Sequence, residues 1–191
     1  MKLIVGLGNH GDEYAGTRHN AGWDAVRVAA KELGASDFKI KKDFKAAIAE
    51  TNVEGQKVLF ALPQTYMNLS GDAVQAIKTF YKLSNEDILI IHDEMDYAPG
   101  TIAFAANAGP AGNNGVASVQ ERLGTKRIAR LRIGIGRGTH DSKDWVLSRF
   151  SKEDAKAIAA RREDMVHAIT DWITRGLTQS MNTWNAVKSG N

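Results

Sequence analysis

Apolar residues follow two spacings along this chain, and stretches of the two kinds alternate. Short runs rich in Val, Ile, Leu and Phe predict six β-strands. They cover residues 2–7, 46–50, 57–62, 88–92, 101–104 and 130–135. Glu54 and Gly55 separate the second run from the third, and this pair favours a hairpin turn.

Apolar residues at helical spacing lie between or after most of these runs. This spacing predicts helices over residues 21–33, 71–81, 116–123 and 152–174. Ser151 and Asp154 give the last of them a Ser-x-x-Asp start, which is typical of a capping box. Strands that alternate with helices, together with one hairpin, predict an α/β fold with a twisted mixed β-sheet flanked by α-helices. We expect a single domain over residues 1–191.

Composition narrows the class of protein. The chain is 43% hydrophobic and 25% charged, as in an ordinary globular domain. The N-terminus leads directly into a predicted strand and lacks the long apolar stretch of a signal peptide, and no apolar run approaches the length of a transmembrane helix. The absence of cysteine excludes disulfides, thiolate metal sites and a cysteine nucleophile. We therefore expect a cytoplasmic protein that does not associate with a membrane.

Basic residues gather near the last predicted strand, although the net charge of +3 is small. They are Lys126, Arg127, Arg130, Arg132 and Arg137. Within the strand, arginine alternates with leucine and isoleucine, which places Arg130 and Arg132 on one face. The alternation alone favours a solvated strand face.

A glycine pattern after the first strand suggests a different class of function. Gly6, Gly8 and Gly11 match G-x-G-x-x-G, the fingerprint of nicotinamide-dependent oxidoreductases. That fingerprint requires a helix that opens at the third glycine and points its positive end at a pyrophosphate. Two acidic residues follow the third glycine here, and helical spacing begins only after His19. The sequence therefore disfavours the oxidoreductase interpretation.

Neutral amides, histidines and acids occur where predicted strands end and helices begin. Asn9 follows the first strand, His19 precedes the first helix, and Asp93 lies at the end of the fourth strand. Asn114 lies near the end of the glycine-rich stretch 107–115, which we interpret as a functional loop. In an open α/β sheet, ligands bind in the crevice beyond the carboxyl ends of the strands, where these segments can converge.

Seven sequence blocks resemble, in order, the signatures of bacterial peptidyl-tRNA hydrolases. The blocks are Asn9-x-Gly11, Tyr14, Thr17-Arg18-His19-Asn20, Met67-Asn68-Leu69-Ser70-Gly71, His92-Asp93-Glu94-x-Asp96-x-x-Pro99-Gly100, Asn114-Gly115 and Arg130-Leu131-Arg132-Ile133-Gly134-Ile135-Gly136. One block alone would be weak, but seven in register over essentially the whole chain are specific. The resemblance implies a hydrolase that cuts the ester between a peptide and the 3′ end of tRNA, and so recycles tRNA from aborted translation.

The resemblance also implies roles for individual residues. His19 would act as the base that activates a water molecule, Asp93 would orient His19, and Asn9 would help to position that water. The implied substrate-binding residues are Tyr14, Tyr66, Met67, Asn68, Asn113, Asn114 and Arg132. Asparagine suits this task, because its amide donates and accepts hydrogen bonds without a charge.

The other histidines have no predicted chemistry. We expect a structural role for His92, and solvent-facing positions for His140 and His167. The five histidines lack metal-ligand spacing, so we expect no metal site, and the family resemblance implies no other cofactor.

One alternative from another class is an RNA-binding relative of the family with weak or lost hydrolase activity. Retention of both His19 and Asp93 favours the enzyme, and a pure RNA binder would be expected to gain basic residues. We expect a monomer whose partner is peptidyl-tRNA, bound through its acceptor stem, CCA end and peptide.

Four positions depart from the family pattern. His10 stands where proline is usual, which should loosen the turn slightly. Asn113 stands where histidine is usual, and an amide cannot titrate. Ala103 and Ala105 stand where lysines usually grip the acceptor end of tRNA, whereas Arg132 is retained. We therefore expect tRNA binding with a shallow salt dependence.

Overall fold

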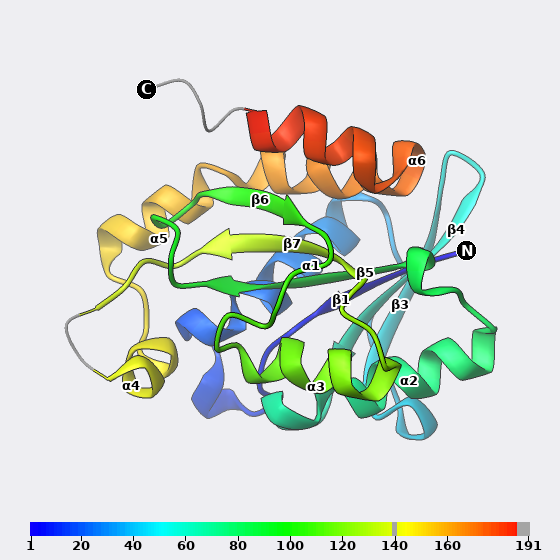
Figure 1. Cartoon of the computed structure of the whole chain (residues 1–191), viewed down its shortest axis with the longest axis horizontal. Helices are drawn as coiled ribbons and strands as arrows, with labels where there is room; N and C mark the ends of the chain where they lie inside the picture. Colours follow the sequence, from blue (N-terminus) through cyan, green and yellow to red (C-terminus); the bar gives the residue numbers. More distant parts are fainter. Residues whose placement is uncertain (139–140, 187–191) are drawn as a thin grey trace.

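One seven-stranded β-sheet forms the centre of the molecule, and helices lie on both of its faces (Figure 1). The structure is a computed structural model that describes residues 1–138 and 141–186. The strand order is β2-β3-β4-β1-β5-β7-β6. The α/β class and the mixed sheet predicted from the sequence are confirmed.

The inner strands of the sheet are parallel, and antiparallel strands flank them. The inner strands are β4 (Gln56–Pro63), β1 (Lys2–Gly6), β5 (Ile88–Glu94) and β7 (Ala129–Gly134). Outside them, β3 (Ala46–Val53) pairs with β4, β2 (Lys39–Lys41) pairs with β3, and β6 (Ile102–Ala105) pairs with β7. Buried apolar residues dominate the inner strands, as expected for parallel strands covered on both faces. The carboxyl ends of β1, β4 and β5 consequently meet at one end of the sheet.

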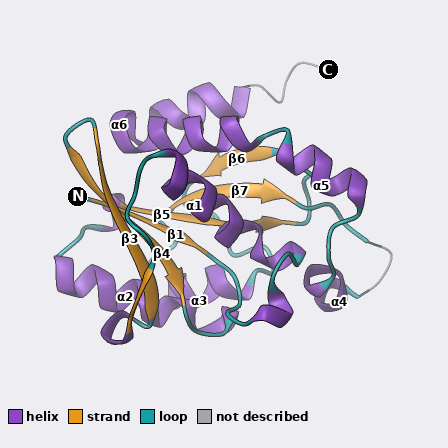
Figure 2. Cartoon of the chain, turned by 180° about the vertical axis from the view of Figure 1, so that it is seen from behind, coloured by secondary structure: helices purple, strands orange, loops and turns teal. Residues whose placement is uncertain are grey.

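Two helical layers cover the sheet (Figures 1 and 2). Helices α1 (Ala21–Glu32) and α6 (Arg162–Ala186) pack against one face, and α2 (Ser70–Tyr81) and α3 (Asn114–Leu123) pack against the other. The short helices α4 (Ser142–Leu147) and α5 (Lys152–Ala159) lie between β7 and α6 in the chain. Single 3₁₀ turns complete the fold: η1 (Asp12–Tyr14), η2 (Arg18–Asn20), η3 (Lys42–Phe44), η4 (Met67–Leu69) and η5 (Asn85–Asp87).

Helix α1 approaches the sheet closely through a pair of glycines. A Cβ atom added at Gly6 would lie 2.5 Å from the carbonyl oxygen of Gly22, so no other residue fits at this position without movement. This contact brings the start of α1, and with it η2, against the carboxyl ends of β1 and β5. A Cβ atom at Gly8 would likewise lie 2.6 Å from the Trp23 ring, so tight packing around the end of β1 explains the first two glycines of the G-x-G-x-x-G pattern.

All six predicted strands are present, and the predicted hairpin joins β3 to β4. Glu54 and Gly55 have φ values of 50° and 82°, as a two-residue hairpin turn requires. The sequence did not predict β2 or α4. The prediction of one helix over residues 152–174 is wrong, because α5 ends at Ala159 and α6 begins at Arg162. Ser151 caps α5 by accepting a hydrogen bond from Asp154 nitrogen, at 3.1 Å.

Helix α6 changes direction at Gly176, whose φ of 76° is non-helical. The Trp184 indole nitrogen donates to the Asp171 carboxylate at 2.9 Å, across thirteen residues of chain. This contact shows that the two halves of α6 lie side by side. The second half also covers the edge of the sheet, where the Asn185 amide bonds to the backbone nitrogen and oxygen of Phe104 in β6.

None of the helices formed by residues 1–138 and 141–186 combines the length and the apolar character that crossing a membrane would require.

Candidate active site

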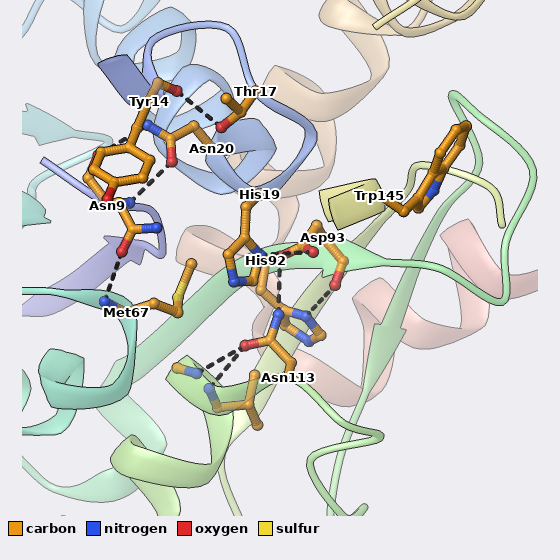
Figure 3. A network of polar contacts seen from close by, with 12 residues as sticks. Asn9, Tyr14, Thr17, His19, Asn20, Met67, His92, Asp93, Asn113 and Trp145 are labelled. Carbon is orange, nitrogen blue, oxygen red and sulfur yellow. Dashed lines mark hydrogen bonds and ion pairs between the residues drawn. The ribbon is translucent and has the colours of Figure 1, made fainter. Parts of the chain in front are cut away.

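A pocket of about 700 Å³ opens where the carboxyl ends of β1, β4 and β5 meet. Its walls come from segments that are far apart in the sequence: the turn after β1, the 3₁₀ turns η1, η2 and η4, the end of β5, the start of α3, and α4. Nine of the ten residues predicted from the sequence line it. They are Asn9, Tyr14, His19, Tyr66, Met67, Asn68, Asp93, Asn113 and Asn114. Figure 3 shows the polar contacts that connect several of them.

His19 and Asp93 form a buried pair at the base of this pocket. His19 Nδ1 lies 3.0 Å from Asp93 Oδ2, and the two residues are 9% and 4% exposed. An ionised carboxylate only accepts hydrogen bonds, so Nδ1 carries the ring hydrogen and Nε2 presents its lone pair. Nε2 is therefore the atom that can take a proton from water in the pocket.

The two residues that precede His19 are held in place by side-chain contacts. The Thr17 hydroxyl donates to the carbonyl oxygen of Tyr14 at 2.8 Å. Arg18 is buried, pairs with Asp154 of α5 at 2.8 Å, and stacks on the Trp145 ring at 3.8 Å. Because Arg18, next to His19, is anchored to α4 and α5, the His19 ring has little freedom to leave Asp93.

The Asn9 side chain is equally well held. Its oxygen accepts a hydrogen bond of 2.8 Å from the backbone nitrogen of Met67. The Asn20 side chain bonds to both the backbone nitrogen and the backbone oxygen of Asn9, at 2.9 Å and 3.0 Å. With Oδ1 used in this way, Asn9 Nδ2 is the donor that faces the pocket (Figure 3). The neighbouring His10 ring lies 5.5 Å from the Tyr66 ring, centre to centre.

Asp93 has a second side-chain partner. Asn113 Nδ2 donates to Asp93 Oδ1 at 2.8 Å, while Asn113 Oδ1 accepts from the backbone nitrogens of Gly115 and Val116 at 3.0 Å and 3.1 Å. Asn113 is thus both the N-cap of α3 and a hydrogen-bond donor to Asp93.

His92 lines the pocket but is almost completely buried, and it has a structural contact. Its Nδ1 donates to the carbonyl oxygen of Asp93 at 2.7 Å. Burial lowers the pKa of His92 to about 4, because the charged ring would lose its hydration. His92 is therefore neutral at pH 7, which agrees with the predicted structural role. His167 is exposed, as predicted, and His140 lies outside the described residues.

The glycine-rich stretch is anchored by Arg130, which the sequence placed on a solvated strand face. That interpretation is wrong for Arg130, which is 2% exposed and donates to the carbonyl oxygens of Ala108 and Gly109 at 3.0 Å each. The Gln120 amide donates to the same Ala108 oxygen at 2.7 Å. The strand alternation correctly predicts which face of the strand carries Arg130, but the glycine-rich stretch covers Arg130 on that face and excludes solvent from it.

Arg132 is the one predicted site residue that does not line the pocket. Its side chain is 24% exposed, lies 3.6 Å from the Glu94 carboxylate, and stacks on the Tyr97 ring at 4.7 Å. Ala103 and Ala105 of β6 stand opposite Arg132 and Arg130 in the sheet register, and both alanines are buried.

Some pocket residues were not predicted as site residues from the sequence. Glu94 and Met95 follow Asp93 directly, and Lys143, Val146 and Leu147 come from α4. The Asp141 side chain caps α4 by accepting a hydrogen bond from the backbone nitrogen of Lys143. In the sequence, this N-cap residue was the signal from which α4 could have been predicted. No group of three or more metal-ligating side chains occurs in the part of the chain that the structure describes.

Comparisons with known proteins agree on one family. The sequence model described as peptidyl-tRNA hydrolase matches residues 3–191. The peptidyl-tRNA hydrolase of Mesoplasma florum is 43% identical over 189 residues, covering 97% of this chain and all of that protein. The enzyme of Desulforamulus reducens is 41% identical and covers 97% and 89%. Among solved structures, peptidyl-tRNA hydrolase from Acinetobacter baumannii superimposes with a TM-score of 0.90 at 35% identity, over 97% and 95% of the two chains.

Proposed function

The chain belongs to the peptidyl-tRNA hydrolase family, and we propose that His19, Asp93 and Asn9 carry out its reaction in the pocket beyond β1 and β5. The protein hydrolyses the ester bond that joins a peptide to the 3′ end of tRNA. The comparisons offer no support for the alternative of an RNA-binding relative without this activity.

Water attack begins the proposed reaction. His19 Nε2 takes a proton from a water molecule, whose oxygen attacks the ester carbonyl carbon. The carbonyl oxygen becomes an oxyanion, and Asn9 Nδ2 donates to it. Asp93 stabilises the imidazolium that His19 becomes, through the 3.0 Å contact at Nδ1.

Collapse of the tetrahedral intermediate completes the reaction. The bond between the carbonyl carbon and the 3′ oxygen of tRNA breaks, and His19 Nε2 returns its proton to that oxygen. The products are a tRNA with a free 3′ hydroxyl and a peptide with a free carboxylic acid, which loses its proton to solvent and leaves as the carboxylate. No covalent intermediate with the protein forms in this scheme.

Substrate recognition is proposed for further residues of the pocket and for Arg132, which lies outside it. Asn68 and Asn114 are exposed at the pocket and present neutral amides to the peptide main chain and the CCA end. Tyr14, Tyr66 and Met67 supply apolar surface for peptide side chains. Arg132, with its partly exposed guanidinium, would bind a phosphate of the acceptor stem.

The observation that carries this proposal is the buried His19–Asp93 pair, whose free Nε2 belongs to the pocket. The test is release of peptide from N-acylated aminoacyl-tRNA by protein treated exhaustively with EDTA. We expect full activity without metal, and a loss of about a hundredfold or more in kcat for His19→Ala with tRNA affinity retained. His167→Ala, a change at the exposed histidine of α6, is the matched control. Wild-type turnover in His19→Ala, or activity that returns only with zinc, would contradict the mechanism.

We also propose that the protein works as a single-domain monomer in the cytoplasm, where its substrate arises during translation. The single-domain part of this proposal is supported by the pocket, whose described walls all come from elements packed around one sheet. Light scattering of the purified protein, free and with tRNA, tests the oligomeric state.

A further inference from the structure

Both oxygens of the Asp93 carboxylate are held, and only one of the two contacts belongs to the proposed catalytic pair. Oδ2 faces His19, and Oδ1 accepts from the Asn113 amide at 2.8 Å. We propose that Asn113 is a positioning residue, which fixes the Asp93 carboxylate so that it orients His19. This inference rests on the roles proposed above for His19 and Asp93.

The orientation of the Asn113 amide follows from its neighbours. Two backbone nitrogens of α3, those of Gly115 and Val116, point at one end of the amide, and a carboxylate faces the other end. A flipped amide would set hydrogen-bond donors against donors at the helix and an acceptor against an acceptor at Asp93. The oxygen must therefore face α3, and the nitrogen must face Asp93.

This arrangement ties the catalytic carboxylate to a rigid element. The start of α3 is tightly packed, since a Cβ atom added at Gly115 would lie 3.0 Å from a Leu7 methyl group. Ser118, one turn later, accepts a hydrogen bond from the backbone nitrogen of Gly71 at 3.0 Å. Rotation of the Asp93 carboxylate would break a charge-assisted hydrogen bond to a group that cannot follow it. The plane of the carboxylate is consequently fixed before substrate arrives.

Asparagine at position 113, where histidine is usual in the family, suits the role of positioning Asp93. An amide donates at every pH, whereas a given imidazole nitrogen donates only in one tautomer or when the ring is protonated. Asn113 is 8% exposed, its oxygen is used twice by α3, and only one amide hydrogen remains for a substrate. The two possible roles of Asn113 predict different kinetics. If Asn113 binds substrate equally in the ground and transition states, its loss raises KM, whereas if it positions Asp93, its loss lowers kcat.

The first test is Asn113→Ser in the full-length protein. Serine keeps an acceptor for the α3 nitrogens, but its hydroxyl cannot also reach Asp93. We expect kcat to fall by about tenfold or more, as for other partners that orient a functional group, with KM unchanged. The low-field proton resonance of His19 Nδ1 should shift or broaden. Ser84→Ala, which removes an N-cap side chain at the opposite end of β5, is the matched control and should change neither kinetics nor resonance.

The second test exchanges the two side chains. In Asp93→Asn, the new amide cannot satisfy both partners. If its oxygen accepts from His19, its nitrogen faces the Asn113 nitrogen, and if it is flipped, its nitrogen faces His19 Nδ1. In Asp93→Asn with Asn113→Asp, the new amide can accept from His19 through its oxygen and donate to the new carboxylate, which still caps α3. We expect the double variant to be more active than Asp93→Asn alone.

Each outcome decides the question. A raised KM with wild-type kcat in Asn113→Ser would make Asn113 a substrate contact and overturn the inference, as would unchanged kinetics and an unchanged resonance. A double variant no more active than Asp93→Asn would also contradict it. If Asn113→Ser does not fold, Asn113→Asp, which keeps a strong N-cap, must lose activity while folded. Wild-type turnover in His19→Ala would instead refute the proposed function itself.

Discussion

The side-chain oxygen of Asn9 accepts a 2.8 Å hydrogen bond from the backbone nitrogen of Met67, 58 residues away. The contact joins the turn after β1 to the turn η4 after β4, and it fixes which end of the Asn9 amide faces the pocket. The backbone of Asn9 is held in turn by the Asn20 side chain. Asn9 Nδ2 is thus a donor set in place before the reaction, as stabilisation of an oxyanion requires.

Asn9→Asp should abolish this stabilisation with little change in structure. The carboxylate keeps an acceptor for Met67 nitrogen, but it places negative charge where the oxyanion develops. We expect kcat to fall by about a hundredfold to a thousandfold, measured by peptide release from N-acylated aminoacyl-tRNA. Asn182→Asp makes the same chemical change on an exposed part of α6 and should be silent. A variant with normal kcat would remove Asn9 from the mechanism.

Asp93→Asn should impair His19 without removing it. If the new amide oxygen faces His19, its nitrogen collides with Asn113 Nδ2, 2.8 Å from the present carboxylate oxygen. If the nitrogen faces His19, Nδ1 loses its hydrogen and Nε2 gains one, so Nε2 can no longer accept a proton. We expect kcat to fall by about a hundredfold and to remain above that of His19→Ala. Equal activity of Asp93→Asn and wild type in the same assay would exclude the orienting role.

The sequence predicted the elements whose apolar pattern is regular. Strand β2 escaped prediction because its three residues, Lys39–Lys41, are all exposed and show no alternation of buried and exposed positions. The break between Ala159 and Arg162 has no glycine or proline to mark it, so tertiary packing decides it. The two helices pack against different parts of the protein. Helix α5 lies on the turn before β6, where Gly100 is next to the Ala157 carbonyl, whereas α6 packs into the main core through Trp172.

The candidate site was predicted through the family resemblance rather than through local pattern. Position in the sequence shows which residues end strands, so His19, Asp93 and the asparagines were found together. It does not show that one asparagine caps a helix and holds a carboxylate, because that depends on where α3 starts relative to β5. Nor does it distinguish a solvated arginine from Arg130, whose partners are backbone carbonyl oxygens of a loop.

His92 should make the protein less stable in mild acid. Its pKa is about 4 in the folded protein and 6.5 when unperturbed, so the unfolded chain binds the proton more tightly. The contribution of neutral His92 to the free energy of unfolding is fully present above pH 6.5. It decreases as the pH falls below this value and is completely lost below about pH 4. A shift of this size amounts to roughly 3 kcal/mol. Urea denaturation of His92→Gln at several pH values should give a flatter dependence than wild type, and His167→Gln should not.

Lysines introduced at the family positions in β6 should destabilise this protein. The family resemblance places Ala103 and Ala105 where lysines usually grip tRNA, but in this protein both alanines are buried and stand opposite Arg132 and Arg130. Two ammonium groups there would be desolvated beside like charges. We expect Ala103→Lys with Ala105→Lys to lose at least about 2 kcal/mol of unfolding free energy, measured with urea. Ala106→Lys, at the next, exposed position, is the control and should cost little.

Arg132 should account for a measurable part of the electrostatic attraction to tRNA. Each phosphate contact contributes close to one unit to the slope of log affinity against log salt, so Arg132→Gln should reduce the slope by about one. The competing location is the lysine cluster of β2 and η3, at the opposite edge of the sheet. Replacing Lys39, Lys41 and Lys42 with glutamine should leave the slope unchanged, because tRNA extending from the pocket past β7 would not reach that edge. A steep native slope that collapses in the triple variant, and not in Arg132→Gln, would place the acceptor stem along β2 instead.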